Sequence, residues 1–292
     1  MALPRLIFVT GKGGTGKSTI AAALALTLAR HRPASLADLD RRLSAARLLG
    51  ASLDDASTAH INETLEVFAL APRAELEAFI GRIVPIRGVA RRMLKSRTFG
   101  FVTAALPGLE AFLMLERLRL MADEAAKEDR FVVVDGPATG NAIELLSVAR
   151  GIKQLAPFGT LNRLASGVEE FLTDASRCGI LITLLPEELA LREALEAIAT
   201  MREKLGLSCV AAALNCVPSA LFTTAEMTKV TQLGAHAELV ERRRASAEFA
   251  SRAHERLKQA GVDVVELPMM FRSSLGQREL TELGRKLVSA LL

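Results

Sequence analysis

Short apolar runs alternate with segments of helical periodicity along most of the chain. The first run, residues 5–9, is followed by an Ala-rich apolar helix over 17–30, and the same succession recurs further on. This succession is typical of a mostly parallel sheet whose strands are connected by crossover helices. About seven strands are expected, over residues 5–9, 34–40, 65–70, 130–134, 178–185, 208–214 and 262–267. The pattern therefore predicts an α/β fold in a single domain over residues 1–292.

Helical periodicity also predicts a small helical subdomain beside the sheet. It would comprise residues from about 86 to 127, interrupted by a turn signal at Pro107-Gly108, and from about 151 to 177. A long charged helix over 235–261 and an amphipathic helix over 276–292 follow. The apolar positions of the first segment could form a groove for a client or ordinary core, and stripes at helical spacing favour core. These positions are Phe99, Phe101, Val102, Leu106, Phe112, Leu113, Met114 and Leu115.

Composition excludes several classes of protein. Hydrophobic residues make up 50% of the chain and charged residues 24%, which excludes a disordered chain. No apolar run approaches the roughly 20 residues of a membrane span, and the first residues lack the features of a secretory signal. The three cysteines include no CxxC pair, so free thiols in a reducing compartment are expected. These observations predict a cytoplasmic protein.

The charge balance gives no indication of nucleic-acid binding. The formal net charge is +4, which a solvated surface accounts for without an anionic partner. Trp and Tyr are absent, so a platform for stacking single-stranded bases would have to be built from Phe alone. No nucleic-acid partner is therefore expected.

The strongest chemical signal is the glycine-rich segment GKGGTGKS at residues 11–18. It matches G-x-x-x-x-G-K-[ST] and lies between a predicted strand and a predicted helix. Glycines let successive backbone N–H groups turn toward phosphate oxygens, and the start of the following helix adds positive partial charge. Lys17 would reach the terminal phosphates of ATP, and the Ser18 hydroxyl would ligate Mg²⁺. The candidate phosphate-binding residues are Gly11, Gly13, Gly14, Thr15, Gly16, Lys17, Ser18 and Thr19.

A second lysine in this loop, Lys12, carries a separate expectation. A lysine on an exposed loop is ordinarily surface charge, but beside a polyphosphate a further cation stabilises transition-state charge. If one subunit supplied Lys12 to the nucleotide of another, ATP would join the two subunits.

Polar residues at the ends of three predicted strands complete the candidate site. Asp135 follows an apolar run and precedes Gly136-Pro137, which is expected to end that strand, so Asp135 is a candidate for the Mg²⁺ shell. Asp38 and Asp40 close the second strand, and one of them would orient the attacking water. Period-two alternation places both on one face and does not choose between them. Asn215 could pair with the adenine edge or cap the turn before Pro218.

Several of these segments resemble one known family. GKGGTGKS resembles the deviant phosphate loop of the ParA/MinD/ArsA class of dimeric ATPases. DGPATGN at 135–141, followed by Leu145-Leu146, resembles switch II of the ArsA branch, which holds arsenite-pump ATPases and targeting factors for tail-anchored membrane proteins. Further resemblances to that branch occur at Asp40 with Leu43-Ser44 and Gly50, at Pro107-Gly108-Leu109-Glu110, at Leu185-Pro186-Glu187, at Leu214-Asn215 and at Leu267-Pro268-Met269-Met270.

The resemblance implies an ATPase that closes on Mg-ATP as a dimer of two copies or of this chain with a paralogue. Lys12 would then reach across the interface, and Gly136 would sense the γ-phosphate. Asp40 would position the hydrolytic water and belong, with Ser18 and Asp135, to the magnesium site. Asn215, Pro268, Met269 and Met270 would hold adenine. Hydrolysis would reshape a helical surface that handles a membrane-protein or other hydrophobic client or an anion pump, with peripheral membrane location through partners.

The chain departs from the family pattern at two switch positions. Arg41 and Arg42 stand where switch I has Pro-Ala-His, and Asn141 stands where switch II has His. The CxxC zinc clasp of the targeting factors is also absent, so dimerisation would rest on nucleotide or on other surfaces. Two alternatives therefore stay open: a ParA/MinD-type nucleotide-gated scaffold with little turnover, and a weakly catalytic subunit of a heterodimeric ATPase.

Overall fold

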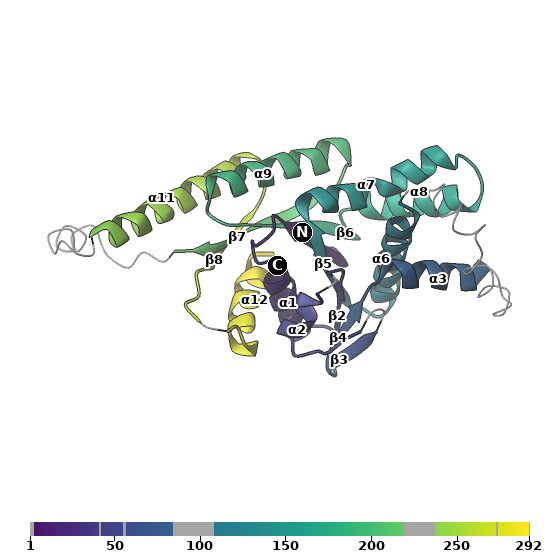
Figure 1. The fold of residues 1–292 in the computed structure, drawn as a ribbon, viewed down its shortest axis with the longest axis horizontal. Helices are drawn as coiled ribbons and strands as arrows, with labels where there is room; N and C mark the ends of the chain where they lie inside the picture. Colours follow the sequence, from purple (N-terminus) through teal and green to yellow (C-terminus); the bar gives the residue numbers. More distant parts are fainter. Residues whose placement is uncertain are drawn as a thin grey trace.

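One eight-stranded sheet forms the centre of the protein, in the strand order β3-β4-β2-β5-β1-β6-β7-β8 (Figure 1). The computed structural model describes residues 3–40, 42–54, 57–83, 108–218, 237–272 and 274–291. The strands are β1 (Leu6–Gly11), β2 (Ala34–Asp38), β3 (Thr58–Asn62), β4 (Leu65–Ala69), β5 (Phe131–Ala138), β6 (Cys178–Leu184), β7 (Cys209–Val217) and β8 (Val264–Pro268). Every described strand pair is parallel except β3–β4, which confirms the predicted mostly parallel α/β sheet.

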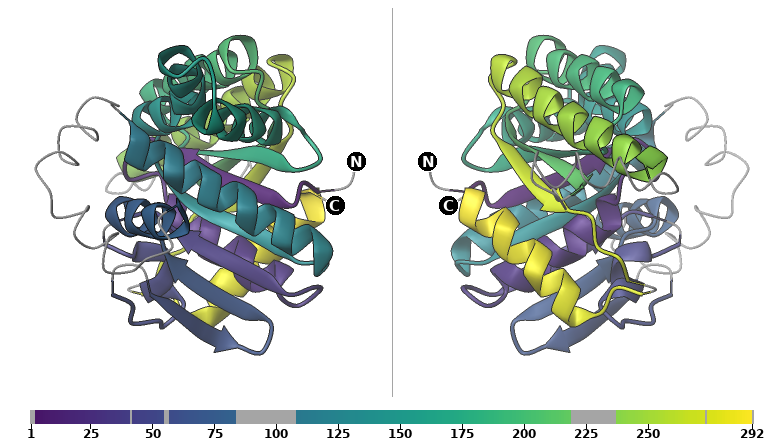
Figure 2. Two further views of the ribbon diagram at one scale, coloured as in Figure 1. Left: turned by 90° about the vertical axis from the view of Figure 1, so that its right-hand side faces the viewer. Right: turned by 90° about the vertical axis from the view of Figure 1, so that its left-hand side faces the viewer.

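Helices cover both faces of this sheet, as the two views of Figure 2 show. They are α1 (Lys17–Leu28), α2 (Ser44–Leu48), α3 (Pro72–Ile83), α6 (Leu109–Lys127), α7 (Thr139–Leu155), α8 (Thr160–Thr173), α9 (Glu188–Ala199), the π-helix η1 (Thr200–Lys204), α11 (Ala237–Gln259) and α12 (Gln277–Leu291). No helix in the described ranges is both long and apolar enough to cross a bilayer.

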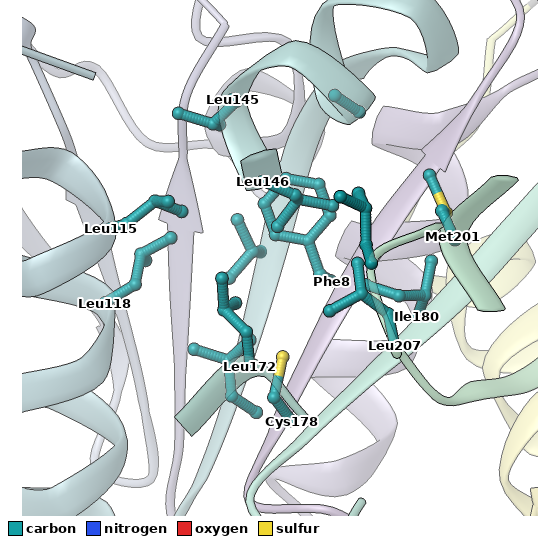
Figure 3. Packing of buried hydrophobic residues seen from close by; sticks show 14 of the residues in the cluster. Phe8, Leu115, Leu118, Leu145, Leu146, Leu172, Cys178, Ile180, Met201 and Leu207 are labelled. Carbon is teal, nitrogen blue, oxygen red and sulfur yellow. The ribbon is translucent and has the colours of Figure 1, made fainter. Parts of the chain in front are cut away.

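The inner strands supply side chains to two separate cores because successive residues point to opposite faces. In β1, Leu6 and Phe8 pack with α3, α6–α9, η1 and α11, whereas Ile7 and Val9 pack with α1, α2 and α12. Figure 3 shows Phe8 in the first core, next to Leu146 and Ile180. Strands buried on both faces read as continuous apolar runs, which is why the sequence revealed them.

One strand was missed, and each of the seven predicted strands differs from the observed one by one to four residues at one or both ends. The prediction of about seven strands omits β3, a polar edge strand whose residues alternate between exposed and half-buried. The second strand ends at Asp38 rather than at residue 40, because the Asp38 carboxylate accepts hydrogen bonds from the turn that follows. The Gly136-Pro137 pair does not end β5, which continues to Ala138 beside a register shift in its pairing with β1. Such an irregularity tolerates a proline, which has no N–H for the ladder.

The predicted helical subdomain is described only in part. Residues 84–107, with Phe99, Phe101, Val102, Leu106 and Pro107, lie outside the described residues. From residue 109 onward the expectation of ordinary core is confirmed, since Phe112, Leu113, Met114 and Leu115 are all buried. The second segment, 151–177, comprises the end of α7 and the helix α8. The three cysteines are free thiols, and burial raises the pKa of Cys178 and of Cys209 to about 12.

The helices α1 and α12 cross at backbone distance. A Cβ added at Gly284 of α12 would lie 2.0 Å from the Thr27 Oγ1 atom and 2.2 Å from the Ala23 carbonyl oxygen. The side chains of α1 from Ile20 to Leu28 are buried, so the helix has no room to shift sideways. Gly284 therefore fixes how closely the two helices approach.

We expect Gly284→Ala to lower the free energy of unfolding by about 1–3 kcal/mol, because the added methyl overpacks a contact made by backbone. The matched control is Gly151→Ala in α7, where an added Cβ would meet no atom within 4 Å. This control should be neutral or stabilise the fold by up to about 1 kcal/mol. Urea unfolding of both variants measures the difference, and equal stabilities would contradict the assigned helix contact.

Candidate functional site

The glycine-rich loop lies between the end of β1 and the start of α1, and it packs against residues of the strands β6 and β7. A Cβ at Gly11 would lie 2.1 Å from the Thr183 carbonyl oxygen of β6. A Cβ at Gly16 would lie 2.4 Å from the Asn215 Nδ2 atom of β7, and Gly16 has a φ of +92°. Glycine is therefore required at these two positions by close packing as well as by backbone conformation.

Thr15 is the inner anchor of the loop. Its side chain is buried, its Oγ1 donates to the Lys12 carbonyl oxygen at 2.9 Å, and its Oγ1 shares a hydrogen bond with Thr183 Oγ1 at 2.7 Å. Asn215 Nδ2 donates to the Thr15 carbonyl oxygen at 2.9 Å. Thr183 was not among the predicted site residues, although it is the one hydroxyl residue inside the apolar run 178–185.

Asn215 is not a turn cap, which was one of its two predicted roles. It lies inside β7, is buried, and contacts the loop through its amide. Pro268 is paired with Val217 in the sheet register, and the Met269 N–H donates to the Val217 carbonyl oxygen at 2.9 Å. The structure therefore brings the end of β7 and the segment Pro268–Met270 together at one sheet edge. Their contact with adenine stays a prediction.

Lys17 and Lys12 point in different directions. Lys17 Nζ donates to the Lys12 carbonyl oxygen at 3.2 Å, and burial lowers its pKa while Asp135 and Asp40 act in the opposite direction. Lys12 Nζ instead forms an ion pair with Glu193 Oε1 of α9 at 2.8 Å, with both side chains about 40% exposed. Glu193 could not be predicted as a partner, because it lies 181 residues away from Lys12 along the chain.

Asp38 and Asp40 take different positions, which strand alternation did not distinguish. Asp38 is fully buried and accepts hydrogen bonds from the backbone N–H groups of Asp40 and Ala46, each at 3.0 Å. Asp40 lies beyond the strand, half-buried, and accepts hydrogen bonds from the Ser44 hydroxyl at 2.7 Å and the Arg42 N–H at 3.2 Å. Asp38 thus anchors the turn after β2, where switch I is expected, and Asp40 is the carboxylate that solvent can reach. Arg41 lies outside the described residues.

Asp135 is a buried carboxylate without a hydrogen-bond partner. It is 1% exposed, and neither oxygen is hydrogen-bonded within the described part of the chain. Burial raises its pKa to about 7, the nearby Ser18 hydroxyl and Lys17 lower the pKa, and Asp38 and Asp40 raise it. Leaving such oxygens unpaired costs about 1–3 kcal/mol or more, so the site is suited to a cation that would supply the missing partner.

The donor set fits Mg²⁺ held partly by water and phosphate. No group of three or more His, Cys, Asp or Glu side chains in the described ranges is arranged to hold a metal. Ser18 and Asp135 offer one hydroxyl and one carboxylate at the loop, and Mg²⁺ commonly keeps several waters and takes few protein ligands beside a nucleotide. Asp40 lies at the same edge of the sheet and would act through water.

Gly136 is fixed by packing against the central strand. A Cβ there would lie 2.4 Å from Phe8 Cε1 and 2.7 Å from the Val9 carbonyl oxygen. The Thr10 Oγ1 atom donates to the Pro137 carbonyl oxygen at 2.8 Å, and α7 begins at Thr139. The segment from Asp135 to α7 is thereby held against β1, directly beside the loop. The role of Gly136 as a γ-phosphate sensor stays a prediction.

Comparison with known proteins points to one family. The profile of the family described as anion-transporting ATPase matches residues 4–158. ATPase BagA of Mycobacterium tuberculosis is 34% identical over 205 residues, which cover 66% of this chain and 60% of the relative. The arsenical pump-driving ATPases of Escherichia coli and Acidiphilium multivorum are 28% identical over 197 residues, which cover 65% of this chain and 31% of those proteins. The match thus spans about 60% of the length of the mycobacterial relative and less than a third of the pump ATPases.

We expect Asp135→Asn to stabilise the metal-free protein at pH 8 more than at pH 4. The folded-state pKa of about 7 lies above the ordinary value of 3.8, so the native state retains a proton that the unfolded chain releases between these values. The free energy of unfolding contributed by Asp135 therefore falls as pH rises from about 4 to 7. The variant loses this pH dependence, and at pH 8 its free energy of unfolding should exceed that of the wild type by about 2–4 kcal/mol.

Urea unfolding in the presence of a chelator at both pH values measures this gain. The contrasting control is Asp174→Asn, because hydrogen bonds from the Ser176 hydroxyl and N–H lower the pKa of Asp174 and its charge favours the fold at neutral pH. A gain for Asp135→Asn that is equal at both pH values would contradict the assigned burial of its charge.

Proposed function

Because the chain belongs to the anion-transporting ATPase family, we propose that it binds Mg-ATP and hydrolyses it to ADP and phosphate. The observation that carries the proposal is the buried, unpartnered Asp135 carboxylate beside Lys17 and Ser18 at a rigid glycine-rich loop. Backbone N–H groups of the loop and the start of α1 would bind the phosphates. Mg²⁺, when bound, would neutralise charge on the β- and γ-phosphates.

Three residues would have separate roles in the proposed hydrolysis of ATP. Water would attack the γ-phosphorus while the bond from that phosphorus to the bridging oxygen breaks, leaving ADP. Asp40, reachable by solvent and held by Ser44, would orient this water by accepting a hydrogen bond from it. Lys17 would stabilise the charge that develops on the transferring group. Asp38 would position Asp40 through its hydrogen bond to the Asp40 N–H.

We also propose that ATP promotes association with a second copy or a paralogue. The side chain of Lys12 is paired with Glu193, so it would have to leave Glu193 to reach the phosphates of a partner's nucleotide. This separation costs little, because a half-exposed ion pair contributes at most about 1 kcal/mol.

Coupling to a hydrophobic client would run through α7. This helix begins at Thr139, three residues after Gly136, and ends at Leu155, which is exposed together with Phe158. A helix of 17 residues spans about 25 Å. A displacement of the start of α7 on nucleotide binding would therefore move the exposed apolar residues at its other end, about 25 Å away. The arsenical pump-driving ATPases among the relatives suggest a membrane pump as another client.

We expect Lys17→Ala to lower the rate of ATP hydrolysis at least about 100-fold, because the group that stabilises the terminal phosphates is lost. Phosphate release with Mg-ATP measures this rate, and Lys127→Ala, at an exposed position of α6, should leave the rate unchanged. Hydrolysis that persists in Lys17→Ala would exclude the proposed reaction. ATP-dependent dimers with little turnover in the wild type would instead support the nucleotide-gated scaffold.

Glu193→Gln should increase the dimer fraction at a limiting concentration of a non-hydrolysable ATP analogue, by up to about five-fold, since Lys12 is then released without breaking an ion pair. The matched control is Glu196→Gln, one turn further along α9 and exposed. Sedimentation velocity measures the dimer fraction. Lys12→Ala should abolish the analogue-dependent dimer, and a dimer that forms equally well without Lys12 would rule out its role between subunits.

A further inference from the structure

A second polar site lies at the opposite end of α1 from the glycine-rich loop. Here Arg30, which follows α1, and one face of α12 line an open surface hollow of about 640 Å³. The two helices lie side by side (Figure 1), and α1 is about 18 Å long, so this hollow is separate from the nucleotide site. It is lined by Arg30, Gln277, Arg278, Thr281, Glu282 and Arg285.

The hollow carries excess positive charge that the protein does not neutralise. In the described part of the chain, none of Arg30, Arg278 and Arg285 has a carboxylate within 4.0 Å, and Glu282 is the one acidic side chain of the lining. Other arginines of the chain are paired with carboxylates, as Arg5 and Arg32 are with Asp129. Unpaired guanidinium groups around one hollow are ready to accept an anion.

The neighbouring carboxylate of Glu279 is engaged mainly at the start of α12, although Arg278 is among the charges that lower its pKa. Glu279, next to Arg278 in sequence, accepts a hydrogen bond from the Gly276 N–H at 3.0 Å and lies 3.8 Å from Arg272. Its charge is therefore directed mainly to the start of α12 rather than to the hollow.

Of the three arginines, Arg30 is held in place by a hydrogen bond within the described part of the chain, whereas Arg278 and Arg285 are exposed side chains on a helix whose position is fixed. Arg30 Nη2 donates to the buried Thr281 Oγ1 atom at 3.1 Å, which ties the end of α1 to the face of α12. The close crossing at Gly284 holds the two walls at a constant separation. Arg278 and Arg285 are seven residues apart on one helix, so they share a face about 10 Å apart along its axis. A preorganised group such as Arg30 loses little entropy on binding.

We infer that this hollow binds an anion carrying two or more phosphate groups. Guanidinium groups form paired hydrogen bonds with phosphate, and a separation of about 10 Å suits two groups better than one. The volume lies within the range of small-molecule sites. Glu282 opposes the anion and limits its affinity. Two sources share this chemistry, namely soluble polyphosphate compounds and the headgroups of phosphorylated lipids.

Calorimetric titration of the full chain with tripolyphosphate tests the inference. The nucleotide site is first saturated with ADP, with Mg²⁺ in excess, so that the glycine-rich loop is occupied. We expect one tripolyphosphate per chain, with affinity at least 10-fold weaker in the double variant Arg278→Ala/Arg285→Ala and a few-fold tighter in Glu282→Gln. ADP affinity should be the same in all of them. The control Arg163→Ala removes an exposed arginine of α8 on the other face of the sheet and should change nothing.

A second arm uses vesicles of phosphatidylcholine with and without phosphatidylinositol bisphosphate. Binding that depends on Arg278 and Arg285 in either arm supports the site, and the arm in which it is tighter identifies the source. Tripolyphosphate binding that disappears once ADP is present, or binding that the double variant retains, would overturn the proposal. Arg30→Ala, a substitution outside α12, should also weaken binding. A loss of binding in this variant as well would show that the effect of the double variant does not come from misfolding of α12.

Discussion

The shape of the glycine-rich loop depends on one set of hydrogen bonds, those that tie Thr15 to the strands beneath it. Thr15 is bonded through its hydroxyl to Thr183 of β6 and through its carbonyl oxygen to Asn215 of β7. Gly11 and Gly16 let the loop approach these same two residues more closely than any side chain would permit. Two strands that carry no part of the sequence motif therefore set the geometry of the motif, and the backbone N–H groups converge before any anion arrives.

Around this loop the protein retains an arrangement that is unfavourable for its own stability. Asp38 and Asp135 are adjacent in the sheet and both buried, and burial raises the pKa of each carboxyl. Asp38 has hydrogen bonds from the turn after β2, but Asp135 has no partner in the described structure. The Asp135 carboxylate lacks hydrogen bonds that a cation and its water shell would replace. Carboxyl groups with shifted pKa values cluster at sites where such ligands bind.

Much of this could be predicted from sequence because the signals are local. Strands buried on both faces appear as apolar runs, and the phosphate loop is contiguous in sequence. The features that were missed depend on tertiary context. The strand β3 is polar and lies at an edge, and β5 passes through Gly136-Pro137 only because its pairing with β1 is irregular. Alternation could not separate Asp38 from Asp40, since the strand ends between them. Thr183 and Glu193 contact loop residues that are 168 and 181 positions away from them in the sequence.

The crossing of α1 and α12 has a consequence for how the protein acquires its active form. The helix that begins at the phosphate loop is covered by sheet on one side and by a helix made more than 240 residues later on the other. During synthesis on the ribosome, α1 therefore keeps an apolar face exposed until α12 emerges. The loop and its helix mature last, although they are translated first, and the nascent chain depends on other means of shielding that face in the meantime.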